Sequence, residues 1–348
     1  MNPKQRVIAQ IKHQETDFIP YRLAFESEGL KDELDGFYGN KKWQSVLDNH
    51  ILYLDQANLG LAIPDTDPKF EGLWEDCFGG KWDISKHPPH LVNPPLREPS
   101  LSGYKFPKIN ESISPDWMDK SIKLIAENPD YFIVARLGFG IFERSWALRG
   151  FENSLMDAVV NTDFYADLLA QICEFQLSLL DIILQKIPVD GILFADDWGY
   201  QQGVTLGADR WRRFLKPYIA KLYKKAHYAN KFTLNHTCGS VNEIIPDLIE
   251  IGLDVLESVQ PEAKGMNPYE LKKNFGHGIT FFGGLGSQSI IQFGSPKDIE
   301  MEIKHLVNEM GKMGGYILAP AKPIQPGTTI ENIAAIVEGF LLQAGITL

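Results

Sequence analysis

The sequence predicts an α/β fold, a (β/α)8 TIM barrel made by one domain that spans residues 1–348. From about residue 130 to the C-terminus, short apolar runs alternate with segments of helical periodicity, which is the pattern of β/α units. No glycine-rich turn follows the first strand, as a doubly wound nucleotide-binding sheet would require. A length of 348 residues and an apolar fraction of 44% fit a single large barrel.

Six predicted β/α units follow one another in the last two thirds of the chain, and two upstream strands, 19–25 and 57–63, complete a count of eight. The predicted strands are 133–137, 191–195, 232–235, 255–257, 279–282 and 316–318, and the predicted helices are 164–183, 208–229, 242–251, one from 267, one from 295 to about 314, and 329–344.

Local signals support several of these helices. Asn267 and Pro268 are the N-cap and first-turn residues of one helix, with Glu270 at the third position. Pro217 lies inside the pattern of 208–229 and should kink or divide that helix.

Residues 64–128 form a long insertion in the N-terminal third, rich in proline up to about residue 115 and without periodicity. Long loops of this kind in compact domains usually bind ligands or cover a site. Trp74, Phe78 and Trp82 favour an ordered segment. We expect a lid over one end of the barrel.

The net charge of −11 argues against nucleic acid and anionic membranes as partners, because both need a basic surface. No apolar run approaches the roughly 18 residues of a membrane span, and no signal peptide is visible. The three cysteines are too scattered for a disulfide framework. A reduced, cytoplasmic protein is expected.

His236 and Cys238 follow the apolar run 232–234, two positions apart, so an extended chain points both side chains to the same side. A nitrogen and a thiol that meet at a strand end are half of a zinc site, or of a thiol-chemistry site. The histidine and cysteine of an isolated H-x-C segment are more often residues of the buried core. Their position at the C-terminal end of a barrel strand, where such enzymes have their active sites, favours function.

Other strand ends contribute polar residues to the same mouth. Of Asp196 and Asp197, one can cap a helix while the other faces the mouth as a metal ligand, general base or substrate anchor. Glu143 either pairs with Arg144 or acts in the site, and Lys322 is either a surface residue or a partner for an anionic substituent. We therefore take Asp196, Asp197, Glu143 and Lys322 as candidate catalytic residues.

These residues also carry a family resemblance. The chain resembles the uroporphyrinogen decarboxylase superfamily in five segments: Asp196–Gly199, His236–Gly239 with Ile244–Asp254 after it, Val259–Ala263, Phe282–Leu285 and Gly314–Pro320. The resemblance covers most of the chain, is strongest from 190 to 335, and implies a (β/α)8 barrel.

The superfamily holds two chemistries. Its decarboxylases carry an arginine-rich segment after the first strand that holds the propionates of the substrate, whereas this chain has the acidic stretch Leu23–Gly29 there. Acidic side chains would repel a polycarboxylate. The resemblance therefore favours the other branch, the cobamide-dependent methyltransferases, in which a corrinoid protein is the partner.

In the coenzyme M enzymes of that branch, zinc is held by an H-x-C pair and a distant cysteine near the last strand. His236 and Cys238 match the pair, but Ala321 and Lys322 stand where the third ligand would fall. Because a protonated lysine does not bind a cation, Glu257 or Asp196 has to complete the site if Zn²⁺ is bound. We take His236, Cys238 and Glu257 as the candidate metal ligands.

The resulting hypothesis is a zinc-dependent methyltransferase that moves a methyl group between a small methyl donor, such as a methoxylated aromatic compound in O-demethylation, and a corrinoid protein. The alternatives are a methylcobamide:thiol methyltransferase, a carboxy-lyase related to uroporphyrinogen decarboxylase, and a non-catalytic corrinoid- or tetrapyrrole-binding protein. The small molecule is then a methyl donor or acceptor, and a homodimer stays open.

Overall fold

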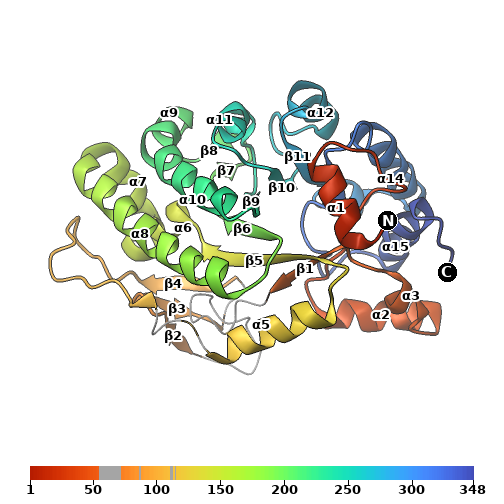
Figure 1. The fold of residues 1–348 in the computed structure, drawn as a ribbon, viewed down its shortest axis with the longest axis horizontal. Helices are drawn as coiled ribbons and strands as arrows, with labels where there is room; N and C mark the ends of the chain where they lie inside the picture. The colour runs from red at the N-terminus through yellow and green to blue at the C-terminus, as the bar shows by residue number, and fades with distance from the viewer. Residues whose placement is uncertain (55–71, 86–87, 110–112, 114) are drawn as a thin grey trace.

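The computed structural model describes residues 1–348 except 55–71, 86–87, 110–112 and 114. Its centre is a curled parallel sheet with strands in the order β1-β5-β6-β9-β10-β11-β12, and helices surround that sheet (Figure 1). The strands are β1 (Ile51–Leu54), β5 (Phe132–Phe139), β6 (Gly191–Ala195), β9 (Phe232–His236), β10 (Val255–Val259), β11 (Thr280–Leu285) and β12 (Tyr316–Pro320).

The segment 20–25 lies between β12 and the residues that precede β1. On one side, Arg22 N–H donates to the Leu318 carbonyl at 3.0 Å, and Tyr21 bridges Leu318 in parallel. On the other side, His50 N–H donates to the Tyr21 carbonyl at 3.1 Å. The predicted strand 19–25 is thus a pair of isolated bridges, and it joins the two edges of the curled sheet. The predicted strand 57–63 falls outside the described residues, whereas β1 lies just before it.

Side chains on the inner face of the sheet form a core of their own, made of alternate residues of each strand. Phe132 and Val134 of β5 meet Leu193, Leu234 and their counterparts on the other strands there. Helix α1 (Pro3–Ile11) contacts β1, β5 and β12, and its Val7 and Ile11 belong to this inner core. Helix α1 therefore packs against the N-terminal ends of β5 and β12, where Lys4 N–H donates to the Asp130 carbonyl and Gly315 N–H to the Gln10 carbonyl.

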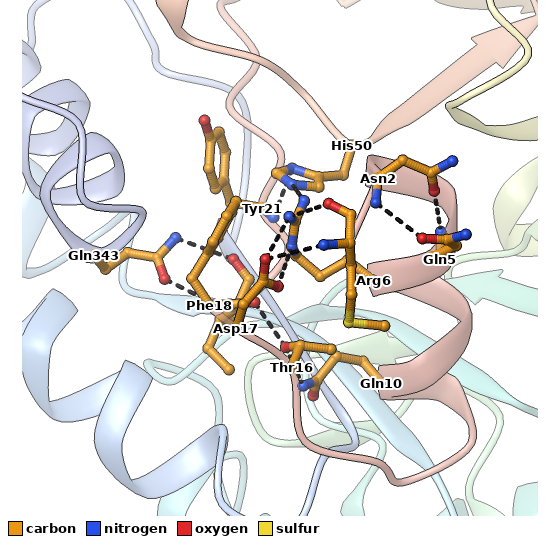
Figure 2. A network of polar contacts seen from close by, with 12 residues as sticks. Asn2, Gln5, Arg6, Gln10, Thr16, Asp17, Phe18, Tyr21, His50 and Gln343 are labelled. Carbon is orange, nitrogen blue, oxygen red and sulfur yellow. Dashed lines mark hydrogen bonds and ion pairs between the residues drawn. The ribbon is translucent and has the colours of Figure 1, made fainter.

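A polar network holds α1 in place (Figure 2). The Arg6 guanidinium donates to both carboxylate oxygens of Asp17, at 2.7 and 2.9 Å, and lies 2.9 Å from His50 Nε2. It also lies over the Phe18 ring, 3.8 Å from its centre. One buried arginine thus connects α1, the following loop and the chain that enters β1.

The helices of the second half lie close to their predicted positions. The predicted helix 208–229 is divided into α9 (Ala208–Arg210), a π-helical turn (Trp211–Leu215) and α10 (Lys216–Tyr228), so the break expected from Pro217 is present. Asn267 accepts from the N–H groups of Tyr269 and Glu270, as an N-cap does. The remaining predicted helices are α8 (Thr162–Lys186), the 3₁₀ turn Asn242–Ile244 with α11 (Ile245–Glu250), α12 (Pro268–Phe275), α14 (Pro296–Met310) and α15 (Ile330–Gln343), whereas the short α13 (Ile290–Phe293) was not predicted.

Other helices were not predicted from the periodicity: α2 (Glu28–Tyr38), α3 (Lys42–Val46), α6 (Ile141–Arg149) and α7 (Phe151–Val160). The described part of the insertion 64–128 also has regular structure rather than the aperiodic loop expected. It contains an antiparallel sheet of β2 (Leu73–Glu75), β3 (Lys81–Asp83) and β4 (His90–Asn93), followed by α5 (Pro115–Glu127). Trp82 of β3 is buried against Trp146 of α6, with ring centres 6.1 Å apart.

The described helices include no candidate membrane span, and even the 25-residue α8 carries charged side chains along its length.

Candidate metal centre

His236 and Cys238 lie where β9 ends. Leu234 points into the inner core, so His236, two residues later on the strand, points to the same side. Cys238 Sγ lies 3.6 Å from His236 Nε2, which confirms the expectation that the two side chains converge. Gly239 follows with φ of +74°, and a Cβ there would meet the backbone of Gly199 and Tyr200 at 2.7 Å. The glycine of H-x-C-G is therefore needed for a close approach of two loops.

Asp197 completes a group of three possible ligands. One carboxylate oxygen of Asp197, His236 Nε2 and Cys238 Sγ all lie within 4.8 Å of one another, and no other such group occurs among the described residues. Asp197 Oδ1 is 4.0 Å from His236 Nε2 and accepts the Cys238 N–H at 2.8 Å. In a tetrahedral zinc site, nitrogen and sulfur ligands stand roughly 3.5 Å apart. The spacing of His236 and Cys238 fits that arrangement without rearrangement.

Glu257, which the sequence suggested as a ligand, lies on the other side of the imidazole. Its Oε1 is 3.6 Å from His236 Nδ1, and its Oε2 accepts from Tyr53 O–H at 2.8 Å. Burial alone would raise the pKa of Glu257, but the contacts with His236, Arg22 and Tyr53 hold it below its usual value. A carboxylate in this position fixes the ring orientation and leaves Nε2 free for a cation.

Asp196 has a structural position. Its carboxylate accepts the N–H groups of Phe142 and Glu143 at 3.0 and 2.8 Å and the indole N–H of Trp198 at 2.7 Å. It thereby binds the first N–H groups of α6, which would otherwise lack partners. Burial raises the pKa of Asp196 to about 7, and the three donors oppose that shift. Gly140 is packed against it, since a Cβ at that position would lie 2.3 Å from the Asp196 side chain.

Glu143, in the first turn of α6, faces the three-residue group. Burial and the carboxylates of Asp197 and Asp196 raise its pKa well above the usual value. Its neighbour Arg144 does not hold it in an ion pair, because Arg144 is directed to Asp76 at 3.2 Å. Glu143 thus lies close enough to Asp197 and His236 to interact electrostatically with both.

A cavity of about 280 Å³ lies beside the possible ligands Asp197, His236 and Cys238, inside the curled sheet. Its lining includes His236, Glu257 and Lys322, and it also includes Arg22 and Arg136, which the sequence interpretation did not select. The signal for Arg136 was present, because a charged residue interrupts the apolar strand 133–137. Arg22 directly precedes the acidic stretch 23–29, whose Glu26 and Glu28 are exposed to solvent. The site is therefore more basic than that stretch suggested.

Comparisons with known proteins show the family of this chain. The model of the uroporphyrinogen decarboxylase (URO-D) family matches residues 79–340, which is most of the chain. The chain belongs to the uroporphyrinogen decarboxylase family. The matched region contains the H-x-C segment, Asp197, Glu143 and Glu257.

The curated relatives lie in the methyltransferase branch of that family. A methylcobamide:CoM methyltransferase MtaA of Methanosarcina barkeri is 32% identical over 133 residues, which are 38% of this chain and 36% of the relative. The chain therefore matches about a third of that protein. A second MtaA, from M. barkeri strain Fusaro, is 24% identical over 254 residues, 69% of this chain and 70% of the relative.

A solved structure, a methyltransferase from Methanosarcina mazei, superposes with a TM-score of 0.72 and covers 97% of this chain and 98% of its own. At 21% identity it shows the fold alone. Together, the matches confirm the resemblance to the cobamide-dependent methyltransferase branch of the uroporphyrinogen decarboxylase family.

Proposed function

We propose that this protein is a zinc-dependent methyltransferase that moves a methyl group between a small substrate and a corrinoid protein. The observation that carries the proposal is the convergence of Asp197, His236 and Cys238 at the C-terminal end of β9. Nitrogen, sulfur and oxygen donors at this spacing suit zinc, and three protein ligands leave a fourth position for substrate.

In this proposal Asp197 replaces the late cysteine that coenzyme M enzymes use, and Glu257 orients His236 from the far side of the ring. When bound, zinc polarises the heteroatom of the substrate as a Lewis acid, or holds a thiol as the thiolate. Cys238 N–H fixes the Asp197 carboxylate, and Tyr53 O–H fixes Glu257, so both side chains are held before substrate arrives.

Glu143 is proposed to supply a proton. It lies near Asp197, and burial together with that carboxylate raises the pKa of Glu143, which favours the protonated form of its carboxyl group. A protonated carboxyl group beside the metal group can donate to the oxygen that a departing methyl group leaves behind. Asp196 is not assigned a chemical role, because its carboxylate accepts the hydrogen bonds that hold the start of α6 and Trp198 in place.

The cavity volume bears on the alternatives. A space of about 280 Å³ holds a small molecule, whereas pockets for drug-sized ligands begin at roughly 300 Å³ and a tetrapyrrole is larger still. This disfavours a carboxy-lyase acting on a tetrapyrrole. A thiol acceptor stays the second candidate, because the fourth metal position and the basic cavity suit a small thiol as well as a methyl ether.

A corrinoid is larger than this cavity, so in the proposal it stays outside, on a carrier protein that docks at the C-terminal ends of the strands. Phe293, on α13 after β11, is 85% exposed, and Tyr200, in the hairpin after β6, is 54% exposed. Exposed aromatic side chains on the loops around a site are typical of protein interfaces.

The test is to mix the zinc-loaded protein with a Co(I) corrinoid protein and a panel of methoxylated, methylthio and methylamine donors while recording the cobalt spectrum. We expect methylcobalt to form with at least one donor, and formation to stop in Cys238→Ala. Release of carbon dioxide from a carboxylated substrate without corrinoid would instead select the lyase. Corrinoid-protein binding without transfer in either direction would select the non-catalytic alternative.

A further inference from the structure

We infer that Arg22 and Arg136 bind an anionic group of the substrate. The substrate is then a small carboxylate or sulfonate whose reactive oxygen or sulfur lies at the proposed metal site of His236 and Cys238. This inference rests on the proposed function, since it specifies the substrate class of the same site.

The two arginines reach the cavity from separate strands. Arg136 lies on β5 in line with Phe132 and Val134, whose side chains belong to the inner core, and Arg22 lies in the segment between β12 and β1. Both guanidinium groups lie over the ring of Tyr53, at 4.4 and 5.5 Å from its centre. One aromatic ring thus positions two positive charges in the same cavity.

Neither arginine has a carboxylate partner in an ion pair within the part of the chain that the structure describes. Among the described residues that line the cavity, Glu257 is the single carboxylate, and Tyr53 and His236 hold it with Arg22 nearby. Lys322 adds a third cation at the rim. The cavity therefore has more positive charge than its own side chains neutralise.

Guanidinium groups bind planar carboxylates and tetrahedral oxyanions through paired, charge-assisted hydrogen bonds. Arg136 is exposed and Arg22 is half-buried at the cavity, so both guanidinium groups are accessible to an anion that enters it. The volume of about 280 Å³ restricts that anion to a small molecule. Because His236 lines the same cavity, an anion bound there lies beside the proposed metal site.

Matched ligand pairs test this inference without any corrinoid. The pairs are 3-methoxybenzoate with methoxybenzene, and 2-mercaptoethanesulfonate with 2-mercaptoethanol, titrated into the zinc-loaded protein by calorimetry. In the wild type, we expect the anionic member of at least one pair to bind about tenfold more tightly than its neutral partner. The pair that shows the preference identifies the anion.

The variants are Arg22→Gln, Arg136→Gln and Arg136→Lys, with Arg210→Gln on the exposed helix α9 as the matched control. Each glutamine variant should lower the anion preference about tenfold, Arg136→Lys should keep part of it, and Arg210→Gln should keep all of it. Equal binding of anionic and neutral members by the wild type, or an unchanged preference in both glutamine variants, would overturn the inference. If either glutamine variant unfolds, the other glutamine variant and Arg136→Lys still show whether the arginines cause the preference for the anionic ligand.

The outcome is separable from that of the proposed function. A protein that prefers anions but never methylates cobalt would refute methyl transfer and leave the arginine assignment intact. A protein that transfers methyl groups equally well from neutral donors would support methyl transfer and refute the arginine assignment.

Discussion

His236 is held between two different partners: its Nδ1 lies 3.6 Å from Glu257 Oε1, and its Nε2 lies 3.6 Å from Cys238 Sγ. The two contacts separate the roles of the acidic residues around the ring. A carboxylate at Nδ1 orients the imidazole, whereas groups at Nε2 share a cation with it. Asp197 is on the Nε2 side, at 4.0 Å.

The first prediction compares two conservative changes. Asp197→Asn should lose most bound zinc, because it removes a ligand. Glu257→Gln should keep zinc with an affinity about 10- to 100-fold lower, because it removes only the group that orients the ring. Zinc content after dialysis and competition with a chelator measure both. The reverse order, with Asp197→Asn retaining zinc and Glu257→Gln losing it, would restore Glu257 as the ligand.

The sequence was sufficient to predict which strand ends meet. It was not sufficient to predict on which side of the His236 imidazole Asp197 and Glu257 lie. Strand 191–195 coincides with β6, and 232–235 ends one residue short of β9, because apolar runs of buried parallel strands are distinct in sequence. The roles of Asp197 and Glu257 depend on the rotation of side chains at adjacent strands, which no one-dimensional spacing contains. Tyr53 was missed because β1 is short and precedes the segment expected as a strand.

The second prediction concerns Asp196. Asp196→Ala should lower the free energy of unfolding by about 2–3 kcal/mol, since it leaves two N–H groups of α6 and the Trp198 indole without an acceptor. Urea unfolding measures the change, and Asp119→Ala on the exposed face of α5 is the control. At equal concentrations of folded protein, zinc content should match the wild type. A stable Asp196→Ala protein without zinc would instead make Asp196 a ligand.

The third prediction is a pH dependence of stability. Burial and the neighbouring Arg6 lower the pKa of His50 to about 4, below its value of about 6.5 in the unfolded chain. Between these values the unfolded chain binds more protons, so stability is lost as the pH falls from about 6.5 toward 4. Asp17, whose pKa is also lowered, loses its contribution only below about pH 4, outside this window.

We expect the free energy of unfolding to fall by about 2 kcal/mol between pH 7.5 and pH 5 on account of His50. The loss should be smaller in His50→Gln, whose amide oxygen can still accept from Arg6, and unchanged in His90→Gln, an exposed residue of β4. Urea unfolding at the two pH values measures it. The same loss in His50→Gln as in the wild type would show that this network does not control acid stability.

The fourth prediction addresses docking of the corrinoid carrier. Phe293→Ser should raise the KM for the corrinoid protein severalfold, because aromatic residues at interface centres contribute strongly to binding, while zinc content stays at the wild-type level. Tyr228→Ser is the matched control, since Tyr228 is 77% exposed at the end of α10 that leads into the start of β9. Equal KM values for the wild type and Phe293→Ser would place the docking surface elsewhere.

X-ray absorption at the zinc edge of the purified, zinc-loaded protein tests the metal centre most directly. The proposed ligand set predicts one zinc per chain with a single sulfur neighbour at about 2.3 Å and nitrogen or oxygen neighbours at about 2.0–2.2 Å, and it predicts that the sulfur shell disappears in Cys238→Ser. Zinc surrounded by oxygen alone, or no stoichiometric zinc in a fully folded protein, would contradict it.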